Sequence, residues 1–94
     1  MAKAEWNGVV IAESDVYELV EGNVYFPLAS VKSDVLEKTD HTTHCPWKGD
    51  ASYFTIVVDG ARNENAAWIY SAPFEKAAQI KDHIAFWKGV SVTR

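Results

Sequence analysis

Residues 51–70 read ASYFTIVVDGARNENAAWIY, and this stretch decides the fold. Its first part, Ala51–Val58, is dominated by β-branched and aromatic side chains, which favour strands. Both faces of this segment are apolar, as expected of a strand that is covered on both sides, so we predict that it is central. Asp59 and Gly60 favour a tight turn, because glycine accepts positive φ. A partner strand over Asn65–Tyr70 completes an antiparallel hairpin.

The same alternation of apolar segments and glycine turns extends in both directions from this hairpin. Each of the other four glycines follows a polar residue, and we place a turn at each. The segments between the turns predict strands over Lys3–Trp6, Val9–Glu13, Val16–Val20, Val24–Phe26 and Asp40–Cys45, and a last hairpin or bent strand over Ile84–Val92.

Two short helices interrupt this predicted series of strands. One runs over Val31–Glu37, where Ser30 can cap its first turn. The other runs from Pro73, which suits the first position of a helix, to Asp82. The predicted fold is therefore mainly β: two packed antiparallel sheets of short strands, with one or two short helices.

The composition is that of a single small domain over residues 1–94. Apolar residues make up 48% of the chain, with four each of Trp, Tyr and Phe, which is enough for a core. The net charge of −4 argues against a basic face that follows nucleic-acid phosphates and against a polybasic membrane anchor. No apolar run approaches the roughly 20 residues of a spanning helix, and no signal peptide is visible. We therefore expect no nucleic-acid partner and no membrane partner.

Cys45 is the only cysteine, so an intramolecular disulfide and a four-thiolate zinc site are both excluded. A lone thiol suits a reducing compartment, and we predict a cytoplasmic location. Cys45 is also a candidate nucleophile, since a nearby Lys48 or His41 would lower the pKa of its thiol. The alternative is that Cys45 packs as a small apolar residue.

The loop around Cys45, residues 41–50 (HTTHCPWKGD), suggests two further kinds of site. His41, His44 and Cys45, together with a neighbouring aspartate, match no zinc signature, so we expect neither a metal nor a cofactor. Lys48 followed by Gly49 resembles the end of a phosphate-binding loop, but the upstream glycine of that motif is missing. Lys48 remains a candidate partner for a carboxylate or phosphate in an aromatic pocket.

Aromatic side chains that carry a polar atom are candidates to line such a pocket. The set is Tyr25, Trp47, Tyr53, Trp68, Tyr70 and Trp87. Trp68 and Tyr70 share one face of their predicted strand and are the preferred pair. The alternative is that these residues form the core of a domain with few leucines.

Four motifs give the chain a family resemblance. They are Y-F-P at 25–27, T-H-C-P-W-K-G-D-A-S-Y at 43–53, A-W-I-Y at 67–70 followed by Pro73, and I-A-F-W at 84–87. Over nearly its whole length the chain resembles the bacterial family known as domain of unknown function 427. The resemblance implies a tent-like arrangement of two antiparallel sheets, and some catalogues label the family nucleotidyltransferase. By these motifs, the resemblance implies five ligand-binding positions: Tyr25, Cys45, Lys48, Trp68 and Tyr70.

Three functions stay open on the residues alone. The first is a module that binds a small molecule or peptide, with a pocket between the Cys45–Lys48 loop and the face of Trp68 and Tyr70. The second is an enzyme in which Cys45 is the nucleophile or redox centre; the D-x-D motif typical of nucleotidyl transfer is absent. The third is a structural or adaptor subunit that uses exposed aromatic residues, which leaves a homo-oligomer open.

Overall fold

The computed structural model describes all residues, 1–94, and it is built from strands and short 3-10 helices. The strands are β1 (Ala2–Trp6), β2 (Val9–Ser14), β3 (Glu18–Val20), β4 (Asn23–Pro27), β5 (Leu36–Cys45), β6 (Gly49–Val58), β7 (Ala61–Ile69), β8 (His83–Phe86) and β9 (Ser91–Thr93). The 3-10 helices are η1 (Leu28–Ser30), η2 (Ser33–Val35) and η3 (Glu75–Ile80).

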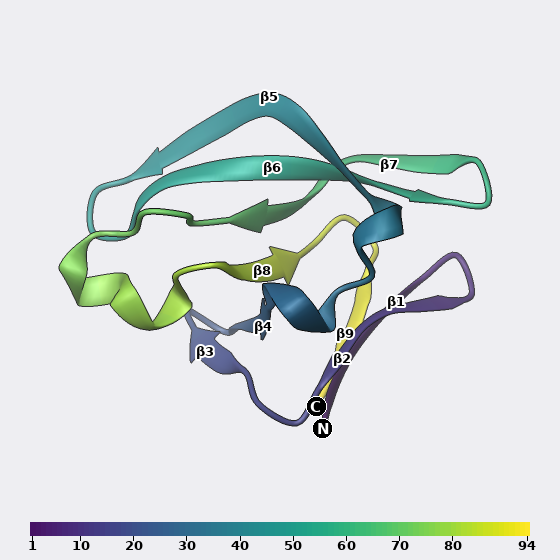
Figure 1. Ribbon diagram of the computed structural model, residues 1–94, viewed down its shortest axis with the longest axis horizontal. Helices are drawn as coiled ribbons and strands as arrows, with labels where there is room; N and C mark the ends of the chain where they lie inside the picture. Colours follow the sequence, from purple (N-terminus) through teal and green to yellow (C-terminus); the bar gives the residue numbers. More distant parts are fainter.

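The strands form two antiparallel sheets, which confirms the predicted fold class. The small sheet has the order β2-β1-β9, and the large sheet has the order β3-β4-β8-β7-β6-β5. In Figure 1 the large sheet descends from β5 at the top through β6, β7 and β8, and the small sheet lies at the lower right. The two chain ends lie close together at the bottom of this view because β9 pairs with β1.

Tight turns at glycine join the hairpins, as predicted. All five glycines have positive φ. The residues immediately before Gly8, Gly22 and Gly60 also have a positive φ, between 50° and 54°. Two successive residues with positive φ give a turn whose twist matches that of the paired strands. These turns fix the register of the three hairpins β1–β2, β3–β4 and β6–β7.

The two predicted short helices are present only as 3-10 segments that are shorter than predicted. In place of a helix over Val31–Glu37 there is only η2, because Val31 is engaged in a bridge with Ala12 and Leu36 already belongs to β5. A segment this short cannot offset the free energy of helix nucleation. The second segment forms η3, whose turns are interrupted at Ala77 (φ −118°, ψ 22°).

Several strand predictions need correction as well. Ile84–Val92 is not a hairpin: β8 belongs to the large sheet and β9 to the small sheet, so the turn at Gly89 carries the chain from one sheet to the other. The strand predicted over Asp40–Cys45 is the second half of the ten-residue edge strand β5, which has a register irregularity between Lys38 and Thr42. The strand β6, predicted to be central, is an interior strand with a neighbour on each side, one place from that edge.

The two faces of the large sheet carry different side chains. Alternate residues of a strand point to opposite faces. In β8, Ile84 and Phe86 face the small sheet and join a cluster of 15 buried residues, whereas Ala85 belongs to a second cluster of 7. In β4, Phe26 joins the first cluster and Tyr25 the second. We call the side that faces the small sheet the core face and the other side the tyrosine face.

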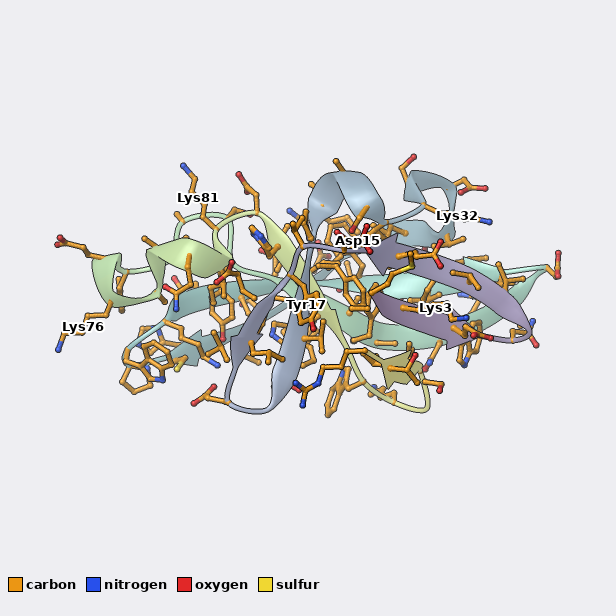
Figure 2. The ribbon with its side chains drawn as sticks, turned by 90° about the horizontal axis from the view of Figure 1, so that it is seen from below. Lys3, Asp15, Tyr17, Lys32, Lys76 and Lys81 are labelled. Atoms are coloured by element: carbon orange, nitrogen blue, oxygen red, sulfur yellow. The ribbon has the colours of Figure 1, made fainter.

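Cationic side chains are spread over the molecule. Figure 2 shows Lys76 and Lys81 at the η3 end of the molecule, and Lys3 and Lys32 farther toward the other end. Lys76 belongs to η3, at one end of the molecule, and Lys3 belongs to β1 in the small sheet. None of the helices is long and apolar enough to cross a membrane.

Candidate functional site

A row of side chains crosses the tyrosine face from β6 to β4. Tyr53 of β6 lies opposite Trp68 of β7, and Trp68 lies opposite Ala85 of β8. On β4, Phe26 pairs with Ile84, so Tyr25 occupies the place next to Ala85. The register therefore brings residues as far apart in sequence as Tyr25 and Ala85 into one line across four strands.

The small side chain of Ala85 leaves room for a direct contact between Trp68 and Tyr25. The indole Nε1 of Trp68 donates a hydrogen bond of 3.1 Å to the hydroxyl of Tyr25. The two rings meet edge to face, with centroids 6.2 Å apart and an interplanar angle of 85°. Because Tyr25 is fully buried (0% exposed), its hydroxyl is a fixed acceptor that orients the indole of Trp68 from the interior side.

Above this row lies a pocket of about 230 Å³. It is lined by Lys48, Tyr53, Trp68, Tyr70 and Trp87. Four of the five are aromatic, and Lys48 is the only charged residue among them. The rings of Trp68 and Trp87 meet at 87° with centroids 6.2 Å apart, and those of Tyr53 and Trp68 are tilted by 39° at 6.5 Å.

Lys48 reaches the pocket from the turn that joins β5 to β6. Its carbonyl oxygen accepts a hydrogen bond of 2.9 Å from the amide of Phe74, which fixes the turn against the segment before η3. The next residue, Gly49, has φ +111°, and a Cβ at this position would lie 3.5 Å from backbone atoms of that same segment. The positive φ explains why glycine follows Lys48, since the Cβ distances are those of ordinary van der Waals contact.

Lys48 is buried, with 7% of its surface exposed, and its ammonium group has several partners. It donates a hydrogen bond to the carboxylate of Glu21, which lies in the β3–β4 turn. The Nζ atom also lies 5.4 Å from the ring centroid of Tyr70 and 5.7 Å from that of Trp47. Both distances are within the range of a cation–π interaction.

The charges of Lys48 and Glu21 stabilise each other. Burial favours a neutral Lys48, but the hydrogen bond to Glu21 and the nearby Tyr25 and Tyr70 outweigh it, so the pKa of Lys48 is raised. The pKa of Glu21 is lowered, mainly by the hydrogen bond from Lys48 and also by one from the Trp47 indole, 3.4 Å away. Lys48 is therefore a protonated hydrogen-bond donor at neutral pH and not an amine nucleophile.

Tyr70 forms part of the wall nearest to Lys48. It is 4% exposed, and burial raises the pKa of its hydroxyl, although the neighbouring ammonium of Lys48 acts in the opposite direction. Tyr70 is therefore neutral at physiological pH. Every buried side-chain polar atom of the protein has a hydrogen-bond partner, so the polar atoms beneath the pocket are satisfied without a ligand.

Trp87 forms an outer wall and is held by an irregularity in β7. The register of β6 and β7 shifts between Phe54 and Ile56, and Asn65 has a φ of 54° there. The Trp87 indole donates a hydrogen bond of 2.7 Å to the carbonyl oxygen of Asn65, and its amide donates one of 2.9 Å to Ala66. Trp87 is 48% exposed, so these bonds hold an otherwise open side chain in place.

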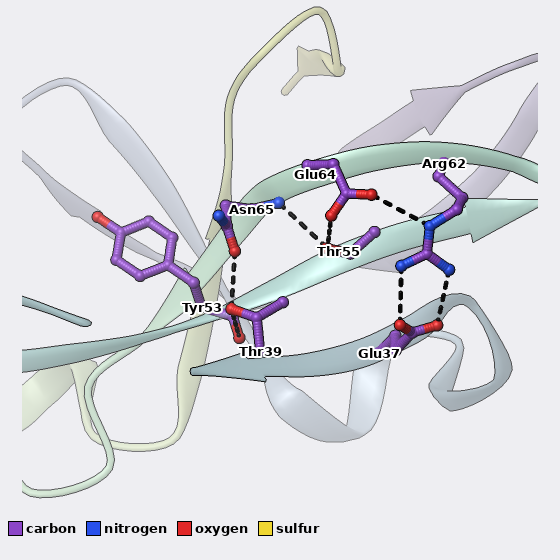
Figure 3. A network of polar contacts seen from close by, with 7 residues as sticks. All are labelled: Glu37, Thr39, Tyr53, Thr55, Arg62, Glu64 and Asn65. Carbon is purple, nitrogen blue, oxygen red and sulfur yellow. Dashed lines mark hydrogen bonds and ion pairs between the residues drawn. The ribbon is translucent and has the colours of Figure 1, made fainter. Parts of the chain in front are cut away.

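A polar network lies beside the pocket on the tyrosine face (Figure 3). Thr39 donates to the side-chain oxygen of Asn65 at 2.7 Å and contacts the Tyr53 carbonyl at 3.3 Å. Farther along, Arg62 forms two hydrogen bonds with Glu37, of 2.8 and 3.0 Å, and one with Glu64. The network joins β5, β6 and β7 where the ladders are irregular. It contacts Tyr53 of β6 and also Asn65 of β7, whose carbonyl oxygen accepts the hydrogen bond from Trp87.

The structure brings together four of the five ligand-binding candidates named from the sequence. Lys48, Trp68 and Tyr70 line the pocket, and Tyr25 lies directly under Trp68. Cys45 is half-buried and packs against the second cluster, but it does not line the pocket.

The histidines near Cys45 have other contacts. The His41 ring lies against Tyr53, with centroids 4.6 Å apart, and His44 is 2.7 Å from the Asp50 carboxylate. No group of three or more His, Cys, Asp or Glu side chains is placed to hold a metal ion. No base is hydrogen-bonded to the Cys45 thiol in the structure. Catalysis by Cys45 stays a prediction.

Analysis of the sequence misses one important residue, Glu21, and does not single out another, Trp87. Glu21 precedes one of the turn glycines, and nothing local in the sequence pairs it with Lys48, 27 positions away. Trp87 was one aromatic candidate among six, and only the positions of β8 and of the irregular part of β7 place it at the pocket. The one usable signal was the shared strand face of Trp68 and Tyr70.

The comparison with protein families confirms the resemblance noted from the motifs. A family model described as Domain of unknown function (DUF427), whose label refers to NTP transfer, matches residues 1–93. No curated protein matches the chain.

Proposed function

The chain belongs to the DUF427 family, and we propose that it is a binding module for a small ring-containing molecule, held in the aromatic pocket of the tyrosine face. The observation that supports this proposal is the convergence of four aromatic side chains and one buried lysine on a single pocket. Ligand sites commonly combine apolar and aromatic walls with a few fixed polar groups.

The walls suit a flat ligand. Trp68 and Trp87 meet nearly at right angles, so a ring in the corner between them can stack on one and place its own edge against the face of the other. Because Trp68 is hydrogen-bonded to Tyr25 and Trp87 to Asn65, the orientations of both indole rings are fixed before a ligand binds. A site that is already ordered loses less conformational entropy on binding.

The size of the pocket limits the ligand. Sites for drug-sized molecules enclose roughly 300–1,000 Å³, and this pocket has about 230 Å³. A compound with a single ring and one polar substituent fits this volume. Lys48 supplies the charged donor, and an oxygen acceptor on the ligand is the complementary group.

Binding can be tested with benzamide as the probe. We expect wild-type protein to bind it with a Kd on the order of 1 mM, as is usual for so small a compound. The variant Trp68→Leu removes a wall and should weaken binding about tenfold or more, which corresponds to one lost stacking contact.

Trp6→Leu is the matched control, because Trp6 belongs to β1 and packs against the first cluster. It should bind benzamide as the wild type does. Binding measured by ligand-observed NMR on both folded variants decides the question. Equal affinities of Trp68→Leu and Trp6→Leu contradict the proposed site.

A further inference from the structure

We propose that Glu21 sets the charge selectivity of this pocket, so that its ligands are uncharged ring compounds with an oxygen acceptor, such as aromatic amides, and ring carboxylates are excluded. This inference rests on the proposed function and assigns the class of ligand.

The first reason is that the positive charge at the pocket is already balanced. Lys48 is the only charged residue in the lining, and its ammonium is hydrogen-bonded to the Glu21 carboxylate. A buried cation that lacks a counter-ion attracts anions strongly, whereas a paired one presents a neutral dipole with donors left over. An ammonium has three donors, so its bond to Glu21 leaves donors for a ligand.

The second reason is repulsion. A ligand carboxylate that reached Lys48 would lie within a few ångströms of the Glu21 carboxylate, at the same ammonium. Like charges at such distances repel each other, and near a protein surface the repulsion is large enough for about a tenfold change in affinity. An amide oxygen makes the same hydrogen bond without this repulsion.

The third reason is that Glu21 is held in place. Trp47 donates to its second carboxylate oxygen, so both oxygens are engaged by the same β5–β6 turn. Its own backbone lies in the tight β3–β4 turn, with φ 54° followed by Gly22. Displacement of Glu21 by a ligand carboxylate would break both contacts, which further disfavours an anion.

The experiment compares benzamide with benzoate, which has nearly the same shape but carries a negative charge. Wild-type protein should bind benzamide at least about tenfold more tightly than benzoate at neutral pH. In Glu21→Gln, the Lys48 charge is no longer balanced, and this preference should fall to near equality or invert. Added salt should change the benzoate affinity of the variant more than its benzamide affinity.

A matched control is Glu13→Gln, which makes the same charge change on exposed Glu13 of β2, in the small sheet. It should keep the wild-type preference. Thermal melting of each protein checks that the comparison is made on folded chains.

The inference is overturned if wild-type protein prefers benzoate, or if Glu21→Gln and Glu13→Gln show the same preference. Those results leave the pocket itself intact, provided that Trp68→Leu still weakens binding. Absence of binding by either compound to wild-type protein and to Glu21→Gln overturns the proposed function together with this inference.

Discussion

The two faces of the large sheet use the same strands for different purposes. The core face packs aliphatic side chains and phenylalanines against the small sheet, and its cluster of 15 residues contains no buried charge. The tyrosine face has a smaller cluster of 7 residues, which includes Tyr25 and Tyr70 and lies against the buried Lys48. Strand alternation alone separates the two.

The difference between the faces indicates where stability and specificity reside. Burial of apolar surface on the core face drives folding. On the tyrosine face, polar atoms are buried only because each has a partner, such as the indole of Trp68 with the hydroxyl of Tyr25. Such an arrangement adds little net stability, but it fixes the positions of a few polar groups.

The largest expected effect on stability comes from a substitution on the core face. Phe26 is fully buried and meets Phe86 edge to face at 5.7 Å. Phe26→Ala should lower the free energy of unfolding by about 3–5 kcal/mol, as is usual for loss of a buried phenylalanine. Urea denaturation measures this loss. A loss below about 1 kcal/mol would show that the core face is not the main source of stability.

An intermediate effect is expected on the pH dependence of stability, through the ion pair of Glu21 and Lys48 on the tyrosine face. The pKa of Glu21 is lower in the folded protein than its ordinary value of 4.5. The unfolded chain therefore binds more protons, and the stability from this group is complete above that value and is lost as the pH falls through the folded pKa. The melting temperature should decrease on acidification below about pH 4.5, and it should do so less in Glu21→Gln than in wild-type protein.

Glu37 and Glu64 also have lowered pKa values, in both cases mainly because of hydrogen bonds from Arg62. They account for the acid sensitivity that remains in Glu21→Gln. Identical pH profiles for wild type and variant would mean that the pair of Glu21 and Lys48 contributes nothing to stability.

The smallest expected effect comes from a substitution in the polar network, and it separates that network from the pocket on the same face. Arg62 joins Glu37 and Glu64 in the exposed network of Figure 3. Exposed ion pairs contribute little because water and salt screen them. Arg62→Met should lower the melting temperature by only a few degrees and leave benzamide binding unchanged. A large loss of binding would assign the network to the site itself.

The sequence was informative where a rule is local. Glycine turns and the alternation of apolar residues predict the hairpins, and the shared face of Trp68 and Tyr70 follows from strand periodicity. Sequence patterns failed at Val31–Glu37, where the bridge from Val31 to Ala12 prevents a helix. They also missed Glu21, because its pairing with Lys48 depends on the order of strands in the large sheet, which no local pattern encodes.

The most direct test of the central claim uses the indole N–H signals of the four tryptophans in an NMR titration with benzamide. Trp68 and Trp87 line the pocket, whereas Trp6 lies in the small sheet. We predict that the signals of Trp68 and Trp87 shift together and saturate, while that of Trp6 stays unchanged. Unchanged signals for Trp68 and Trp87, or an equal shift at Trp6, would contradict a ligand pocket on the tyrosine face.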